Sequence, residues 1–181
     1  MNGAWQIRPE EPGDADAVCA LDNEAFGPGR FAKSAYRLRE GVAHVAELAF
    51  VAMQGGTPVG SVRFWPILVG ETPSLLLGPL AVKEALRGQG IGIDLMRHGI
   101  AKARVLGHAT IVLVGDEPYY ARAGFAKLPP GSVKFPGPVD PQRILGLALK
   151  DGALANLRGP VRRPRIDDPV CAAGAPLGAK S

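Results

Sequence analysis

Residues 75–82 read Leu-Leu-Leu-Gly-Pro-Leu-Ala-Val, and five residues further on residues 87–92 read Arg-Gly-Gln-Gly-Ile-Gly. The first run is typical of a buried strand, and an amphipathic helix pattern follows the second. A glycine-rich turn between strand and helix presents unpaired backbone N–H groups at the positive end of the helix dipole, where phosphate binds. Glycine suits this turn because a Cβ would keep the backbone away from the anion. The sequence therefore predicts a phosphate-binding loop over residues 87–92.

Two common phosphate-binding motifs do not match this loop. The Walker loop ends in Gly-Lys-Ser/Thr, whereas Ile91 and Gly92 follow Gly90 here. The dinucleotide fingerprint requires a third glycine three residues after the second, and this position is Ile93. The loop is therefore neither a Walker loop nor a dinucleotide fingerprint.

The pattern Arg87-x-x-Gly90-x-Gly92 resembles the Gln/Arg-x-x-Gly-x-Gly/Ala signature of the GCN5-related N-acetyltransferases. In that family the loop holds the pyrophosphate of coenzyme A, and the pantetheine arm pairs with the preceding strand as if it were another strand. The resemblance implies acetyl-CoA as co-substrate and no metal. The residues that it implies for acetyl-CoA binding are Leu80, Ala81, Val82, Arg87, Gly88, Gln89, Gly90, Ile91 and Gly92.

A second stretch, residues 115–125, reads Gly-Asp-Glu-Pro-Tyr-Tyr-Ala-Arg-Ala-Gly-Phe. It resembles the Tyr-x-x-x-Gly-Phe segment after the fifth strand of the same family, and one branch of predicted bacterial acetyltransferases most of all. The resemblance implies that Tyr120 faces the thioester as general acid. Adjacent helical residues point about 100° apart, so we expect Tyr119 to pack away from the site. The alternative is that both tyrosines are amphipathic core residues.

The expected chemistry is attack of a neutral amine on the thioester carbonyl, with coenzyme A leaving as a thiolate. A phenol with a pKa of about 10 can protonate a departing thiolate, whose thiol has a pKa of about 8.5. Gly78-Pro79 is the expected point of a strand distortion that offers backbone N–H groups to the carbonyl oxygen. Residues 75–82 contain no carboxylate, so the general base stays open among Glu24, Asp116, Glu117 and a water chain.

Periodicity and turn residues give the order of the elements. We expect strands over residues 4–8, 47–54, 58–69, 74–83, 109–114, 125–128 and 144–149, and helices over 12–26, 31–39, 90–106 and 118–123. This order is that of the acetyltransferase family, an α/β fold with a mixed, mostly antiparallel central sheet and helices on both faces, the acyl-CoA N-acyltransferase fold. The resemblance covers residues 4–128 closely and 142–150 loosely.

The chain of 181 residues is long enough for one domain with a buried core, which we expect over residues 1–157. Beyond Leu157 no aromatic residue occurs and Gly, Pro and Arg dominate, which predicts a disordered tail over residues 158–181. Five prolines and two glycines predict a loop over residues 129–141.

Charge and composition restrict the partners. Three of the four net positive charges follow residue 149, so the body is close to neutral and has no basic stripe of the kind that binds nucleic acid. No apolar run is long enough to span a bilayer and no signal-peptide pattern opens the chain, so we expect a cytoplasmic protein without membrane or nucleic-acid partners.

Cys19 and Cys171 lie far apart and are expected to be free thiols, and the three histidines lack ligand spacing. A homodimer is left open.

Two functions of different class remain. The first is an acetyl-CoA-dependent N-acetyltransferase that acts on a primary amine of a small molecule or protein. The second is a non-catalytic acyl-CoA-binding module that senses or recruits. The missing strand carboxylate favours the module, whereas Tyr120 favours the enzyme, which we take as the prediction.

Overall fold

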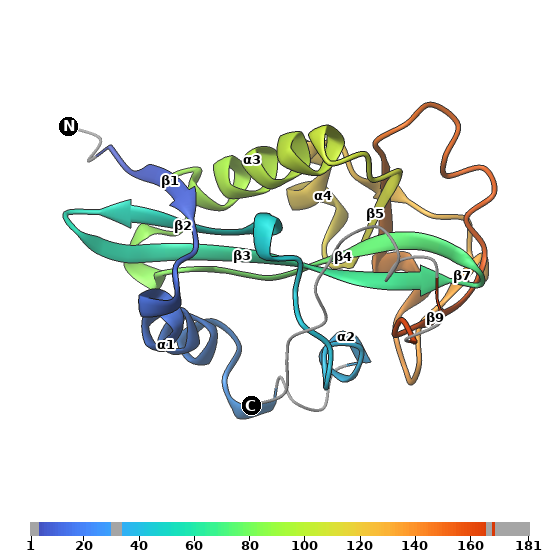
Figure 1. The fold of residues 1–181 in the computed structure, drawn as a ribbon, viewed down its shortest axis with the longest axis horizontal. Coiled ribbons are helices and arrows are strands. Elements are labelled where there is room, and N and C mark those ends of the chain that lie inside the picture. The colour runs from blue at the N-terminus through green and yellow to red at the C-terminus, as the bar shows by residue number, and fades with distance from the viewer. Residues whose placement is uncertain (1–3, 30–33, 166–167, 169–181) are drawn as a thin grey trace.

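In a computed structural model that describes residues 4–29, 34–165 and 168, the chain forms a nine-stranded sheet with helices on both faces (Figure 1). The strands are β1 (Gln6–Pro9), β2 (Ala49–Gln54), β3 (Thr57–Val69), β4 (Thr72–Val82), β5 (Thr110–Val114), β6 (Ala126–Lys127), β7 (Val133–Lys134), β8 (Ile144–Ala148) and β9 (Gly159–Arg162). The helices are α1 (Ala15–Phe26), α2 (Ser34–Arg37), α3 (Ile91–Val105) and α4 (Glu117–Tyr120).

The strand order is β1-β2-β3-β4-β5-β8-β6, with β9 beside β3 and β7 beside β9. Along this path every neighbouring pair is antiparallel except β4 and β5, which are parallel. The predicted mixed, mostly antiparallel sheet with helices on both faces is therefore confirmed.

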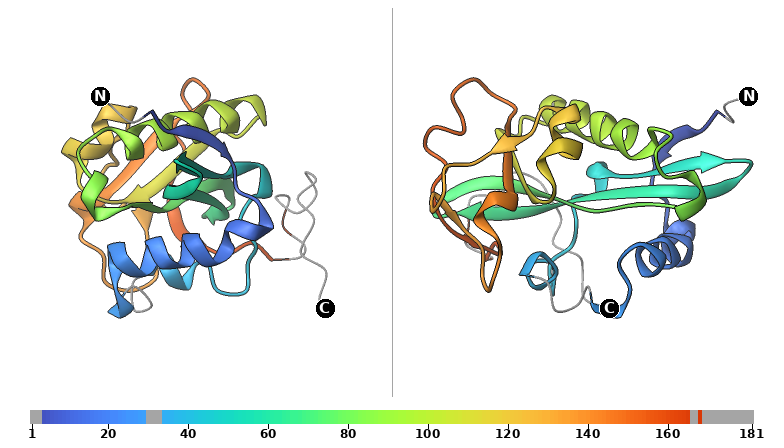
Figure 2. Two further views of the ribbon diagram at one scale, coloured as in Figure 1. Left: turned by 90° about the vertical axis from the view of Figure 1, so that its left-hand side faces the viewer. Right: turned by 180° about the vertical axis from the view of Figure 1, so that it is seen from behind.

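Helix α3 covers one face of the sheet, and α1 and α2 cover the other (Figure 2). The α3 residues at helical spacing that face the sheet, Ile93, Met96 and Ile100, are buried. A Cβ on Gly99 would come within 2.4 Å of the Phe64 ring on β3, so glycine at this position lets the helix approach the sheet closely. This packing fixes the N-terminus of α3 beside the end of β4.

Strand β4 is bulged at Gly78-Pro79, where the sequence predicts a distortion. The pairing register with β3 shifts between Val62 and Phe64, so that Arg63 alone lies opposite Gly78 and Pro79. Proline cannot donate to the ladder and glycine accepts the unusual backbone, here with φ +128° at Gly78.

Strands β4 and β5 separate soon after they meet. They pair over only two residues each, Leu75–Leu76 with Ile111–Val112. Beyond this pairing β4 continues along β3 to Val82, whereas β5 ends at Val114 and leads into α4. The second edge of β4 is therefore unpaired beyond Leu76 within the described residues, and the sheet opens at this point.

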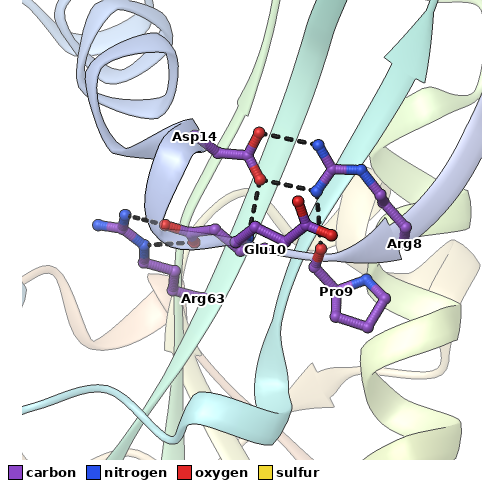
Figure 3. Close-up of polar contacts among 6 residues, drawn as sticks. Arg8, Pro9, Glu10, Asp14 and Arg63 are labelled. Atoms are coloured by element: carbon purple, nitrogen blue, oxygen red, sulfur yellow. Dashed lines mark hydrogen bonds and ion pairs between the residues drawn. The ribbon is translucent and has the colours of Figure 1, made fainter. Parts of the chain in front are cut away.

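Two arginine–carboxylate pairs fasten the first elements to the sheet (Figure 3). Arg8 of β1 donates to both carboxylate oxygens of Asp14 at 2.7 and 2.8 Å, and the backbone N–H of Glu11 donates to the same carboxylate. The hydrogen bonds from Arg8 hold the pKa of Asp14 below its usual range. Arg63 of β3 binds Glu10 through two of its nitrogens. These pairs set where α1 begins and direct it across the face of the sheet that carries Arg63.

Most predicted elements are confirmed with small shifts at their ends. The helix predicted over 31–39 is observed as α2, Ser34–Arg37, and residues 30–33 lie outside the described residues. The loop predicted over 129–141 contains the two-residue strand β7. None of the described helices combines the length and the apolar character needed to cross a lipid bilayer.

The C-terminal segment differs from the predicted disordered tail over 158–181. Gly159–Arg162 forms β9, which pairs with β3 and with β7. Val161 is 4% exposed, and Arg162 donates to both carboxylate oxygens of Asp168. The prediction is wrong for this strand because pairing with β3 and β7 and the burial of Val161 order it without any aromatic residue. Residues 169–181 lie outside the described residues, so disorder there stays a prediction.

Replacing Val161 with alanine is expected to lower the free energy of unfolding by about 2 kcal/mol, because it removes buried methyl groups and leaves a cavity. Urea unfolding measures this change. Lys134→Ala on the adjacent β7 is the control, since Lys134 is exposed. If Val161→Ala unfolds at the same urea concentration as the control, β9 does not contribute to the stability of the body.

Candidate active site

A cavity of about 860 Å³ opens where β4 and β5 separate. Its lining includes Asp22 of α1, Arg39 after α2, Trp65 of β3, Leu80 of β4 and Tyr120 of α4. Side chains from helices and strands far apart in the sequence therefore meet in one space. The cavity is large enough for a small molecule.

The residues around Tyr120 hold its ring in the cavity wall. A Cβ on Gly115 would come within 2.2 Å of a ring carbon of Tyr120, so glycine is needed there. Gly124, with φ +99°, ends the helical turn, and the buried Phe125 then packs edge to face against Tyr120 with ring centroids 6.2 Å apart. The Tyr-x-x-x-Gly-Phe spacing is thus explained by the geometry of one tight turn.

Burial raises the pKa of Tyr120 to about 12, with smaller contributions from Tyr119 and Asp116. The phenol therefore keeps its proton at any ordinary pH and is a hydrogen-bond donor. A thiol has a pKa of about 8.5, which is roughly 3.5 units below the pKa of Tyr120. Complete proton transfer from Tyr120 to a thiolate would therefore cost about 5 kcal/mol. This cost fits within the barrier of about 15 kcal/mol that corresponds to a turnover near 10² per second.

Tyr119 does not pack away from the site, so that prediction is wrong. Its side chain also lines the cavity, and a Cβ on Gly92 would come within 2.2 Å of its hydroxyl. The rings of Tyr119 and Tyr120 are edge to face with centroids 5.1 Å apart. Gly92 leaves room beside the first turn of α3. The Tyr119 side chain occupies this room, so its hydroxyl lies against the glycine loop.

The glycine loop has the conformation that a phosphate site requires. Gly88 and Gly90 have φ values of +82° and +101°, and a Cβ on either would meet no atom within 4 Å. Backbone conformation, rather than crowding, therefore calls for glycine here. The hydrogen bonds of α3 begin with Asp94 N–H donating to the Gly90 carbonyl, which leaves the amides of residues 91–93 without partners in the helix.

The predicted acetyl-CoA residues follow one path through the structure. Leu80 lines the cavity with Tyr120, whereas residues 87–92 lie outside its lining. The end of β4 connects the two, since a Cβ on Gly92 would lie 3.5 Å from Cγ2 of Val82. The exposed Arg87 donates to the carbonyl of Val82 at 3.3 Å, and this hydrogen bond holds the guanidinium beside the loop.

The acids offered by the sequence as general bases are not equivalent. Glu24 accepts a hydrogen bond from the backbone N–H of Glu84 at 2.8 Å, and Glu117 pairs with a lysine at 3.2 Å. Neither of these acids is part of the cavity lining, but Asp116 is, and it pairs with Arg143 at 3.2 Å. In the part of the chain that the structure describes, no group of three or more His, Cys, Asp and Glu side chains could hold a metal ion.

Asp22 is a site residue that sequence reasoning missed. It lines the cavity from α1 and is 8% exposed. A signal for it exists, because Asp22 follows the buried Val18 by four residues and the buried Leu21 by one. An acid on the apolar stripe of an amphipathic helix is unusual and indicates a buried polar role.

Comparison with known proteins identifies the family. The pattern of the acetyltransferase (GNAT) family matches residues 15–127, which include α1, the glycine loop and Tyr120. The chain belongs to this family. It is therefore an N-acetyltransferase of the GNAT type, as its homologues are.

Relatives in Escherichia coli agree with this assignment. YhbS of strain K12, described as an uncharacterized N-acetyltransferase, is 37% identical over 122 residues, 66% of this chain and 72% of YhbS. YjhQ, likewise an uncharacterized N-acetyltransferase, is 33% identical over 129 residues, 69% of this chain and 71% of YjhQ.

Two solved structures of the family resemble the fold. The crystal structure of YhbS from Escherichia coli in complex with CoA has a TM-score of 0.77 and 30% sequence identity. The match covers 91% of this chain and 92% of the YhbS chain. A GNAT acetyltransferase from Brucella melitensis in complex with acetyl-CoA has a TM-score of 0.60 and 30% sequence identity. The match covers 84% of this chain and 99% of the Brucella melitensis chain.

Proposed function

We propose that this acetyltransferase transfers the acetyl group of acetyl-CoA directly to a primary amine held in the 860 Å³ cavity. The observation that carries the proposal is the continuous path from the glycine loop along the end of β4 to Tyr120. The complexes of YhbS with CoA and of the Brucella melitensis protein with acetyl-CoA support it.

The residues of this path fit the parts of acetyl-CoA. The amides of residues 91–93 and the N-terminal end of the α3 dipole suit the pyrophosphate, and Arg87 adds positive charge beside them. The unpaired edge of β4 at Leu80, Ala81 and Val82 suits the amide groups of the pantetheine arm, which would add to the sheet as a further strand.

The cavity end of the path supplies the groups that the transfer needs. The amine nitrogen bonds to the thioester carbonyl carbon, the C–S bond breaks, and its electron pair leaves on sulfur. The bulge at Gly78-Pro79 takes backbone groups near Leu80 out of the regular ladder, where an N–H can stabilise the oxyanion. Tyr120 donates its hydrogen bond to the departing sulfur.

The proton that the amine loses needs an acceptor. We assign this role to Asp22, because it is a buried acid within the cavity, whereas Asp116 is exposed. A general base contributes about 10²–10⁴-fold to a rate. Water between Asp22 and the amine would serve equally to relay the proton.

Gly90→Val is expected to abolish measurable CoA binding, because a β-branched residue does not adopt φ +101° and the loop must change its conformation. Calorimetric titration with CoA measures the effect, with circular dichroism to establish that the variant is folded. Gly29→Ala is the control, since Gly29 has ordinary φ and a Cβ there meets nothing within 4 Å. Wild-type affinity in folded Gly90→Val would place the pyrophosphate elsewhere.

Tyr120→Phe keeps the ring and removes the donor, so kcat should fall on the order of a hundredfold while CoA affinity holds. Because the pKa of Tyr120 is about 12, wild-type kcat should show no alkaline fall from this group up to pH of about 10. The assay is amine-dependent release of free thiol from acetyl-CoA. Tyr119→Phe should change KM for acetyl-CoA more than kcat, since its hydroxyl lies against Gly92.

The thiol-release assay also separates the enzyme from a non-catalytic acyl-CoA-binding module. A module would bind CoA and release no thiol with any amine of a mixed panel. Near-full kcat in Tyr120→Phe would instead make Tyr120 a packing residue and leave protonation of the thiolate to water.

Asp22→Asn is expected to lower kcat/KM on the order of a hundredfold and to remove its acidic limb, because the amide cannot accept the amine proton. Asp116→Asn is the matched variant in the same cavity lining and should change kcat/KM little, since Asp116 is exposed. The pH dependence of kcat/KM for both variants is the measurement. A larger loss in Asp116→Asn would assign the base to Asp116, and unchanged profiles in both would assign it to water.

A further inference from the structure

We infer that the acceptor is an amino carboxylic acid whose carboxylate is bound by Arg39, an inference that rests on the function proposed above for this cavity. Arg39 follows α2 and its side chain lines the cavity. No motif or resemblance in the sequence points to this residue.

Arg39 is half-buried, and its guanidinium lacks a complete set of partners. Its Nε is buried and has no hydrogen-bond partner in the described structure. The Trp65 ring lies beside it, with Cζ of Arg39 5.9 Å from the ring centroid. Burial lowers the pKa of Arg39 to about 10, so the group is still protonated at neutral pH. A buried charged donor that lacks an acceptor is costly, and a bound carboxylate would supply the acceptor.

The other two arginines of the cavity lining are already paired. Arg63 binds Glu10 through two nitrogens, and Arg143 pairs with Asp116 at 3.2 Å. One guanidinium therefore remains for a ligand, which matches the single charge of a carboxylate better than the double charge of a phosphate. A planar guanidinium also accepts a carboxylate in a two-bond arrangement.

The cavity also contains the opposite charge. The negative charge of the buried Asp22 is the one that acts most strongly on Arg39. An amine without a carboxylate would leave Arg39 without an acceptor, and a polyamine would be repelled by Arg39. A ligand that carries both an amino group and a carboxylate can place the carboxylate on Arg39 and the amino group toward Asp22.

The location of Arg39 limits the distance between these two groups of the ligand. A Cβ on Gly78 would come within 2.8 Å of Nη2 of Arg39, so the guanidinium lies over the bulge of β4. Leu80, which we assign to acetyl-CoA, is two residues further along this strand. A carboxylate on Arg39 is therefore close to the acyl group, which favours an acceptor whose amino group is separated from the carboxylate by one or two carbons.

Binding of the reaction products tests the inference without turnover. N-acetyl derivatives of the proteinogenic L-amino acids and the corresponding N-acetyl amino acid amides are titrated calorimetrically into the protein with CoA present. At least one acid should bind tenfold or more tightly than its amide, because only the acid pairs with Arg39. Arg39→Met should remove this preference and Arg39→Lys should retain part of it. Arg37→Met, an exposed position of α2, should retain it fully.

Three results would overturn the inference: no acid binds, acids and amides bind equally, or the preference persists in folded Arg39→Met. If Arg39→Met does not fold, loss of the preference in Arg39→Lys decides in its favour and full retention decides against it. Acetylation of amines without a carboxylate in preference to amino acids would also overturn it and leave the proposed acetyl transfer standing. Failure of the proposed function has a separate signature, since the wild-type protein would then release no thiol from acetyl-CoA with any amine of the panel.

Discussion

The separation of β4 from β5 is the constraint on which the rest of the site depends. The two strands share a pairing of only two residues each, and the bulge at Gly78-Pro79 moves β4 out of regular register with β3. Continuous pairing would satisfy the second edge of β4 and fill the space between the strands. The opening therefore provides both the free strand edge that we propose for the pantetheine arm and the cavity that we propose for the acceptor.

Packing on both faces keeps the two parts of the site in place. On one face, Gly99 lets α3 pack closely against Phe64. This packing places the glycine loop beside the end of β4. On the other face, the pairing of Arg63 with Glu10 helps fix the start of α1 and with it the position of Asp22. In the proposed function α1 is consequently on the acceptor side of the cavity, whereas α3 is on the cofactor side.

The local parts of this site could be predicted from the sequence, and the long-range parts could not. The glycine loop and the segment around Tyr120 are contiguous patterns, each explained by one turn with glycine at positive φ. The role of Arg39 depends on where the segment after α2 meets β3 and β4, which no local pattern encodes. The direction of Tyr119 and the strand β9 were mispredicted for the same reason, because each depends on a neighbour distant in sequence, Gly92 and β3.

A crystal structure of the protein with CoA tests the central claim most directly. The account predicts that the pyrophosphate lies on the amides of residues 91–93, that the pantetheine arm runs along Leu80–Val82, and that the sulfur ends in the cavity within hydrogen-bonding reach of Tyr120. Pyrophosphate bound away from the glycine loop, or a sulfur atom outside the opening between β4 and β5, would contradict it.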